Sequence, residues 1–248
     1  MANALLREDP VLQNFSSPRT AAAADALLSR RSLLLGMAGL GAAALAGCST
    51  SIGSRRIELP NLMPQQFSPE YVQMYAAMPQ ERFPVPAVDL SRLKPTHFRT
   101  EVADQTGERP GTIVVDTPKR YLYLVLEGGR AMRYGVGIGR DGFTWSGRAV
   151  VARKAAWPTW HPPREMMERQ PETRQYAGGM PGGLNNPLGA RALYIYQNGR
   201  DTLYRIHGTG EVWSIGDAVS SGCVRLLHQD VIDLYRRVPV GSPIVVWG

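Results

Sequence analysis

Short runs of β-branched and aromatic residues, separated by turns rich in glycine, proline and asparagine, recur from Gly111 to Trp247. Runs of this length and spacing predict strands joined by short connections. The predicted strands cover residues 112–115, 121–126, 131–138, 146–155, 191–196, 202–207 and 243–247. The 26 glycines and 19 prolines among 248 residues also favour strands and loops over long helices. The pattern therefore predicts a mainly β fold, a sandwich or barrel, for residues 110–248.

One or two short helices are expected to interrupt this β domain. Residues 229–238 carry the strongest helical signal, because apolar residues recur there at helical spacing and Asp230 suits the positive N-terminal end. Residues 164–169 predict a shorter helix, which a proline follows. Ahead of the domain, residues 68–78 predict another short helix with Ser68 as its cap.

The stretch from Ile206 to Arg225 contains the residues that indicate chemistry most directly. His207, one of four histidines, is expected to end the strand at 202–207, and Cys223 follows a Ser-Ser-Gly run. Small residues let backbone amides approach a ligand closely, and an imidazole near a thiol can take its proton during nucleophilic attack. The alternative is a small buried cysteine and an unrelated structural histidine. The glycines beside both residues favour the reactive pair.

The residues around this pair resemble the active-site signature of the L,D-transpeptidases, the YkuD-type catalytic domain. The resemblance rests on His-Gly-Thr at 207–209 and on Ser-Ser-Gly-Cys-Val-Arg at 220–225. Residues 180–194 are similar to the proteobacterial branch of that family, and the similarity extends over residues 110–247. Many members have a histidine two positions before the catalytic cysteine, where this chain has Ser221. That histidine is not the general base, so the change concerns substrate contacts rather than the chemistry.

The resemblance implies a role for each residue of the signature. Cys223 would be the nucleophile and His207 the general base and acid, while the backbone carbonyl of Gly208 would orient the imidazole in place of a carboxylate. The backbone N–H groups of Gly222 and Cys223 would form the oxyanion hole. As the one thiol outside the export region, Cys223 is expected to be partly thiolate near neutral pH.

Three further residues, Arg225, Ser221 and Thr209, are expected to contact substrate. Arg225 either holds the active-site loop or binds a substrate carboxylate, and the sequence leaves both roles open. His161 is predicted to lie on a wall or lid beside the site, and His228 to cap a helix or lie on the surface. The histidines at 97, 161, 207 and 228 lack the spacing of paired zinc ligands, so neither a metal nor a cofactor is expected.

By resemblance, the donor is a peptidoglycan tetrapeptide stem that is cleaved after the L-centre of its third residue, with release of D-alanine. A thioester on Cys223 would keep the free energy of the broken peptide bond, so that an amine accepts the acyl group without a nucleotide cofactor. The acceptor is a side-chain amine of another stem or a lysine of an envelope protein. If water is the acceptor, the same site acts as a carboxypeptidase or amidase. A wall-binding module with an inactive site is disfavoured, because both Cys223 and His207 are present.

The N-terminal region has the features of an exported lipoprotein. The pair Arg30-Arg31 precedes an apolar run at 33–46 that is too short to span a bilayer, which is typical of a twin-arginine signal. An ordinary secretory signal is the alternative. The run ends in Leu-Ala-Gly-Cys, which resembles a lipobox with Cys48 as the first mature residue. Residues 1–47 are therefore predicted to be the signal peptide, and residues 48–109 a lipid-anchored tether and N-terminal extension.

The sequence also predicts where the protein is located and which partners its charge suits. Ser49 after the cysteine resembles lipoproteins sent to the outer membrane, so the protein is expected in the periplasm, anchored to that membrane by lipid. No long Lys/Arg cluster accompanies the net charge of +7, which argues against a nucleic-acid partner. Attraction to a carboxylate-rich cell wall and simple solubility explain this charge equally well.

Overall fold

The computed structural model describes residues 67–139, 146–220 and 222–248. These residues belong to one compact unit, which spans residues 58–248. The predicted signal peptide, Cys48, residues 49–66 of the tether and Ser221 lie outside the described residues. Within the described ranges, no helix is long and apolar enough to cross a membrane.

The described chain is built on a nine-stranded sheet. Its strands in chain order are β1 (Thr100–Ala103), β2 (Ile113–Asp116), β3 (Tyr121–Leu126), β4 (Arg130–Gly135), β6 (Gly147–Ala156), β7 (Arg191–Gln197), β8 (Arg200–Thr209), β10 (Val224–Leu227) and β11 (Pro243–Trp247). Their spatial order is β1-β4-β3-β2-β11-β6-β7-β8-β10, and the pairs β2–β11 and β8–β10 are parallel. Two short strands, β5 (Ile138–Gly139) and β9 (Ala218–Ser220), pair with each other. The predicted mainly β fold is confirmed.

Three α-helices accompany the sheet in the described residues: α1 (Pro69–Met74), α2 (Arg164–Arg169) and α3 (His228–Arg237). Short 3-10 helices occur at Leu90–Arg92, Pro95–His97, Pro171–Tyr176 and Val212–Ser214. The two helices of the β domain, α2 and α3, lie where the sequence predicts them. The first helix is shorter than predicted, because it ends at Met74, and Ser68 stands at its N-cap without a side-chain hydrogen bond.

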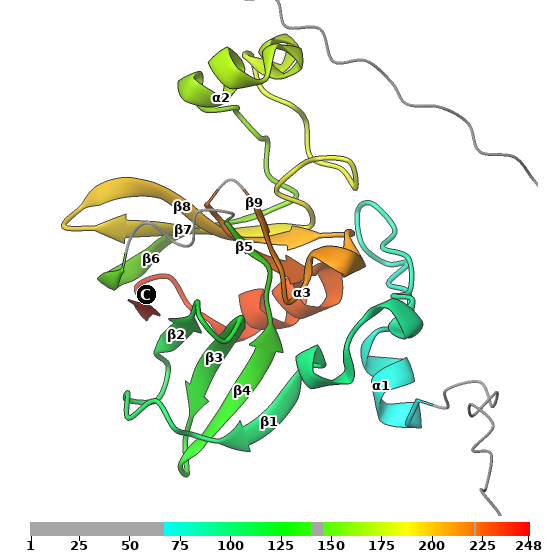
Figure 1. Cartoon of the computed structure of the whole chain (residues 1–248), viewed down its shortest axis with the longest axis vertical. Coiled ribbons are helices and arrows are strands. Elements are labelled where there is room, and N and C mark those ends of the chain that lie inside the picture. Colours follow the sequence, from blue (N-terminus) through cyan, green and yellow to red (C-terminus); the bar gives the residue numbers. More distant parts are fainter. Residues whose placement is uncertain (1–66, 140–145, 221) are drawn as a thin grey trace, which may run out of the picture. The chain divides into compact units, whose positions relative to one another are not determined.

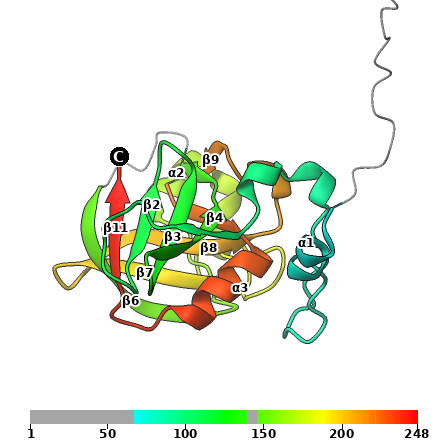
Figure 2. The same ribbon diagram turned by 90° about the horizontal axis from the view of Figure 1, so that it is seen from below.

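The main hydrophobic core lies between two groups of strands, with α3 inside it. Figure 1 shows α3 between β2 to β4 and β6 to β8, and Figure 2 shows the same arrangement from below. Side chains from both groups and from α3 meet in one cluster, which includes Leu122, Tyr134, Leu193, Ile206 and Leu234. Fully burying a leucine or isoleucine contributes about 1.5–3 kcal/mol, so the apolar stripe of α3 holds the two groups together.

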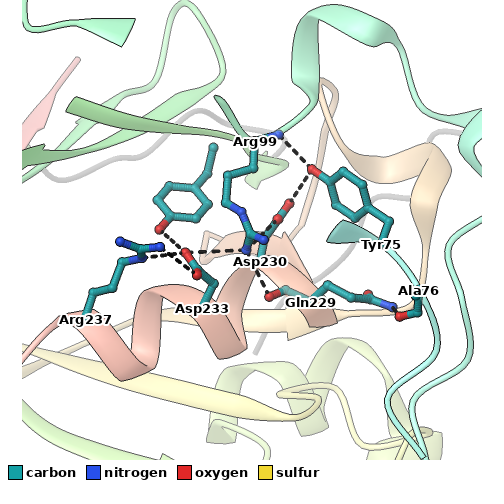
Figure 3. Close-up of polar contacts among 8 residues, drawn as sticks. Tyr75, Ala76, Arg99, Gln229, Asp230, Asp233 and Arg237 are labelled. Carbon is teal, nitrogen blue, oxygen red and sulfur yellow. Dashed lines mark hydrogen bonds and ion pairs between the residues drawn. The ribbon is translucent and has the colours of Figure 1, made fainter. Parts of the chain in front are cut away.

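The segment 67–99, called here the N-terminal strap, packs against α3 through a cluster of polar contacts (Figure 3). The hydroxyl of the buried Tyr75 donates to Asp230 Oδ2 at 3.2 Å and accepts the backbone N–H of Arg99 at 2.7 Å. Arg99 Nη1 lies 3.4 Å from Asp230 Oδ1 and 3.4 Å from Asp233 Oδ2. Because these groups are mostly withdrawn from water, the strap is joined to the helix by charged as well as apolar contacts.

Two further contacts join the strap to the rest of the fold. The side-chain amide of Gln229 donates to the carbonyls of Ala76 at 3.2 Å and Pro86 at 2.9 Å. Glu81 accepts from Arg191, at the start of β7, at 2.7 Å, and both side chains are about nine-tenths buried. The strap therefore touches the elements that lead into the candidate site.

Candidate active site

Two neighbouring parallel strands, β8 and β10, bring the predicted base and nucleophile to one face of the sheet. Their register pairs Ile206 with Val224 and His207 with Arg225. Ile206 and Val224 are fully buried in the main core, which we call the inner side. Because side chains alternate along a strand, His207 and Arg225 lie on the opposite, outer face. Cys223 directly precedes the first residue of β10, and if the alternation continues back by one residue, its side chain lies on the outer face as well.

The imidazole of His207 is held by the backbone of the next residue. His207 is 5% exposed, and its Nδ1 lies 3.0 Å from the carbonyl oxygen of Gly208. Because that oxygen can only accept, Nδ1 carries the proton and Nε2 keeps a lone pair. Burial lowers the pKa of His207 to about 4, the Gly208 hydrogen bond opposes this, and the nearby Arg225 and His228 add to it. The ring is therefore neutral at pH 7 and able to accept a proton.

Cys223 is partly buried beside two arginines. Burial raises the pKa of its thiol, although the backbone N–H of Arg205 and the charges of Arg205 and Arg225 act in the opposite direction. The expectation that Cys223 is partly thiolate near neutral pH is therefore wrong for the resting protein, because the loss of hydration outweighs the nearby positive charge. Cys223 and His207 rest as a thiol and a neutral imidazole.

Gly222 occupies a backbone conformation that suits glycine. Its φ is +124°, which residues with a side chain rarely adopt, and a Cβ there would lie 3.4 Å from Cε1 of Tyr204. This turn leads the chain into Cys223 and β10. The two N–H groups that the resemblance implies for the oxyanion hole, those of Gly222 and Cys223, belong to it.

The remaining residues that were predicted to contact substrate also contact protein. Thr209 is the last residue of β8, so the strand predicted to end at His207 runs two residues further, because residues 206–209 all pair with β10. The Thr209 hydroxyl accepts the backbone N–H of Glu211 at 3.1 Å. Arg225 donates to the Glu211 carboxylate at 2.7 Å, a contact that suits its loop-holding role. Ser221 lies outside the described residues.

His228 is a second buried histidine at the site, and its place differs from the prediction. It is the first residue of α3 and only 4% exposed, and its Nδ1 accepts the backbone N–H of Ala190 at 3.4 Å. A Cβ on Gly208 would stand 2.8 Å from this Nδ1, and one on Gly189 would stand 2.5 Å from His228 Cε1. The prediction of a cap or surface residue is wrong, because the ring fills the space that these two glycines leave. His228 thus packs against the residue whose carbonyl holds His207.

Residues 157–190, called here the cover segment, lie over the outer face of β6 to β8 and include α2 (Figure 1). Trp160 and Leu188 of this segment pack on Ala192 and Tyr194 of β7. The side-chain amide of Asn186 donates to the carbonyls of Pro158, Met180 and Pro181 at 3.0–3.1 Å, which ties the segment to itself. His161 is exposed on this segment, in agreement with a position outside the reactive pair.

Fold and site together define a mainly β domain that carries a cysteine and a neutral histidine on one face of two adjacent strands. The chain belongs to the family of the L,D-transpeptidase catalytic domain, YkuD, whose model matches residues 110–246.

The probable L,D-transpeptidase YbiS of Escherichia coli is 38% identical over 138 residues, which make up 53% of this chain and 43% of that protein. The probable L,D-transpeptidase ErfK/SrfK of the same organism is 35% identical over 141 residues, or 56% of this chain and 44% of that protein. The chain thus matches less than half the length of these relatives. A solved structure from Brucella melitensis, described as a probable carnitine operon oxidoreductase, is 44% identical, with a TM-score of 0.44 over 64% of this chain and 99% of that one. That description applies to the Brucella protein alone.

Proposed function

We propose that this chain is a cysteine L,D-transpeptidase that acts on the stem peptides of peptidoglycan. The observation that carries the proposal is the position of Cys223 and His207 on the outer face of adjacent strands, with His207 Nδ1 held by Gly208, inside the segment that matches the family. The substrate class comes from the family, and the residue roles come from the geometry of the site together with the signature.

In the proposed acylation step, Nε2 of the neutral His207 takes the thiol proton as the Cys223 sulfur attacks the carbonyl carbon of the third stem residue. The tetrahedral oxyanion accepts hydrogen bonds from the backbone N–H groups of Gly222 and Cys223, and each such donor contributes about 3 kcal/mol to catalysis. When the intermediate collapses, the bond to the D-alanine nitrogen breaks and His207 returns its proton to that amine. The product is a thioester on Cys223.

Because both groups rest in their neutral forms, proton transfer accompanies attack rather than preceding it. In the second half-reaction, His207 removes a proton from an incoming amine, which attacks the thioester and restores the thiol. A stem side-chain amine gives a cross-link, and a lysine of an envelope protein gives an attachment. With water in place of the amine, the same steps give a carboxypeptidase.

The experiment that tests the proposal supplies a tetrapeptide stem with and without an amine acceptor. A cross-linked product together with released D-alanine supports the transpeptidase. Release of D-alanine without a cross-link, even at high acceptor concentration, identifies the hydrolase. Cys223→Ala is the control for the nucleophile, and Arg130→Gln, an exposed residue of β4, is a control for handling and expression. If the wild type releases no D-alanine from any stem, the proposal is wrong.

We also propose that the protein is exported and held at the outer membrane by lipid on Cys48. The support is the sequence alone, namely Arg30-Arg31, the apolar run after it and Leu-Ala-Gly-Cys at 45–48. Several acyl chains at about 0.8 kcal/mol per buried methylene give stable anchorage. Cys48→Ala should move the protein from the membrane fraction to the soluble fraction. An unmodified Cys48 thiol in the wild-type mature protein, seen by mass spectrometry, contradicts this part of the proposal.

A further inference from the structure

One charged side chain on the outer face has no role in the steps above. Arg153 of β6 is exposed, and it forms no ion pair with any carboxylate in the described ranges. Its guanidinium carbon lies 3.7 Å from the centre of the Tyr194 ring. A guanidinium stacked in this way covers the ring with its flat face and keeps its in-plane N–H groups for an anion.

The sheet register places Arg153 in the same row as the nucleophile. Arg153 of β6 pairs with Tyr194 of β7, and Tyr194 pairs with Arg205 of β8. Extended by one residue, the parallel register of β8 and β10 sets Cys223 opposite Arg205. The backbone N–H of Arg205 donates to the Cys223 sulfur, which agrees with that extension. The row Arg153–Tyr194–Arg205–Cys223 therefore crosses the outer face, next to the row that holds His207.

The two arginines of this row differ in their partners. Arg205 lies on Tyr194 as well, 4.5 Å from the ring centre, but its guanidinium is held by both oxygens of Asp201 at 2.7 and 2.8 Å. Tyr194 is 5% exposed and is fixed by the cover segment. Arg153 is thus the member of the row that has no carboxylate within ion-pair distance in the described ranges, although its charge helps to lower the pKa of Asp201.

Distance selects which carboxylate of a donor stem can reach Arg153. The row covers three strand spacings of about 4.8 Å, or about 14 Å between the Cα atoms of Arg153 and Cys223. The Arg153 guanidinium lies over Tyr194 on the next strand toward Cys223, so an anion on it lies about 10 Å from the carbonyl under attack. The carboxylate of the departing D-alanine is only about one residue, or 3.8 Å, from that carbonyl, which is too near. A carboxylate at the end of the side chain of the third stem residue matches the distance.

We propose that Arg153, stacked on Tyr194, binds a carboxylate on the side chain of the third stem residue and so selects donors that carry one. The proposal rests on the proposed function, because it names the donor of that same site. Arg153 would touch the substrate about 10 Å from the reacting atoms, and it lies three strands away from Cys223 in the sheet. It therefore sets donor affinity and leaves the chemical step unchanged.

The test uses two synthetic tetrapeptide stems that differ only in this group, one with the side-chain carboxylate and one with the carboxamide. A charge-assisted contact of this kind changes affinity by about tenfold. We expect the wild type to release D-alanine from the carboxylate stem with a KM about tenfold lower, at similar kcat. In Arg153→Gln the two KM values should become equal. Arg153→Lys, which keeps the charge but not the planar fork, should retain part of the preference.

Two controls separate this inference from a general charge effect and from the proposed function. Arg130→Gln removes the same charge from β4, outside the row, and should keep the wild-type preference. Binding of both stems to Cys223→Ala, followed by calorimetry, reports recognition even if no stem is turned over. If Arg153→Gln keeps a tenfold preference in either measurement, or if it lowers kcat equally for both stems, the inference is wrong. Failure of the wild type to react, with the binding preference intact, contradicts only the proposed function.

Discussion

The buried carboxyl group of Asp230 gives the fold a pH dependence that can be measured. Asp230 is fully buried in the first turn of α3, with Tyr75 and Arg99 as its partners (Figure 3). Burial raises the pKa of Asp230 to about 7, although the charge of Arg99 and the hydrogen bond from Tyr75 lower it in part. An aspartate in an unfolded chain has a pKa of about 3.9. The carboxyl group therefore holds its proton more tightly in the folded protein.

The sign of the effect follows from this difference in pKa. Between the two values the folded protein binds the proton and the unfolded chain does not, so stability falls as the pH rises. The stabilising influence of the protonated group is complete below the unfolded pKa and is lost as the pH rises through the folded one. The interval from pH 5 to pH 8 contains about two units of the shift, at about 1.4 kcal/mol each. Asp230 should therefore lower wild-type stability by about 2.7 kcal/mol across this interval.

Asp230→Asn removes the titrating group and keeps its shape. We expect the unfolding free energy of the variant, relative to wild type, to rise by about 2–3 kcal/mol between pH 5 and pH 8. Any effect of the substitution that does not depend on pH cancels in this comparison. Urea unfolding of both proteins at the two pH values, followed by circular dichroism, gives the required free energies.

Glu81→Gln is the matched control. Burial acts to raise the pKa of Glu81, but Arg191 outweighs it and holds that pKa below its usual value. Glu81 thus stays ionised in the folded protein from pH 5 to pH 8, and its substitution should cost nearly the same stability at both. If the relative stability of Asp230→Asn does not change with pH, Asp230 is already ionised in the folded protein at pH 5 and burial does not raise its pKa.

Three further predictions concern the site. In a pH–rate profile, the acylation rate should fall at acid pH with a pKa of about 4, because His207 must be neutral to act as the base. A fall with the ordinary histidine pKa of about 6.5 would show that burial does not lower the pKa of His207. Gly222→Ala should slow acylation at least about tenfold, because its φ of +124° strains a side-chain residue. Gly107→Ala, at another positive φ of +70° and away from the site, should leave the rate unchanged. His228→Leu should lower the free energy of unfolding in urea by about 1–3 kcal/mol, because the buried N–H of Ala190 loses its acceptor. His228→Asn should recover part of that loss. If both variants lose the same stability, the hydrogen bond contributes nothing and only the volume of the ring matters.

Local patterns predicted the elements that are determined locally. The short apolar runs and flanking turns of Tyr121–Leu126 and Pro243–Trp247 predicted β3 and β11 with their observed bounds. The helix predicted at Arg164–Arg169 is also observed with these bounds, as α2. Val224–Leu227 was not predicted as β10, because this segment is too short to show a period and is defined by its pairing with β8. Non-local pairing of this kind has no signal in a single sequence.

Some features of the candidate site could likewise be predicted from the sequence, and others could not. The glycines and the order of residues around His207 and Cys223 indicated the pair and the family. The inward turn of His228 and the row that contains Arg153 depend on which strands become neighbours, and on their register across β6, β7, β8 and β10. The resting protonation of Cys223 also escaped the sequence, because it depends on burial that the flanking glycines do not reveal.

In the proposed mechanism, the Cys223 sulfur carries the acyl group. The most direct measurement is intact-protein and peptide mass spectrometry after incubation with a tetrapeptide stem in the absence of an acceptor amine. We expect an added acyl mass on the peptide that contains Cys223, together with one released D-alanine, and neither in Cys223→Ala. Cys223→Ser should be nearly as inactive, because a hydroxyl is far less acidic than a thiol and His207 is held only by a carbonyl. An adduct on another residue, or full turnover by Cys223→Ala, would contradict the proposed mechanism.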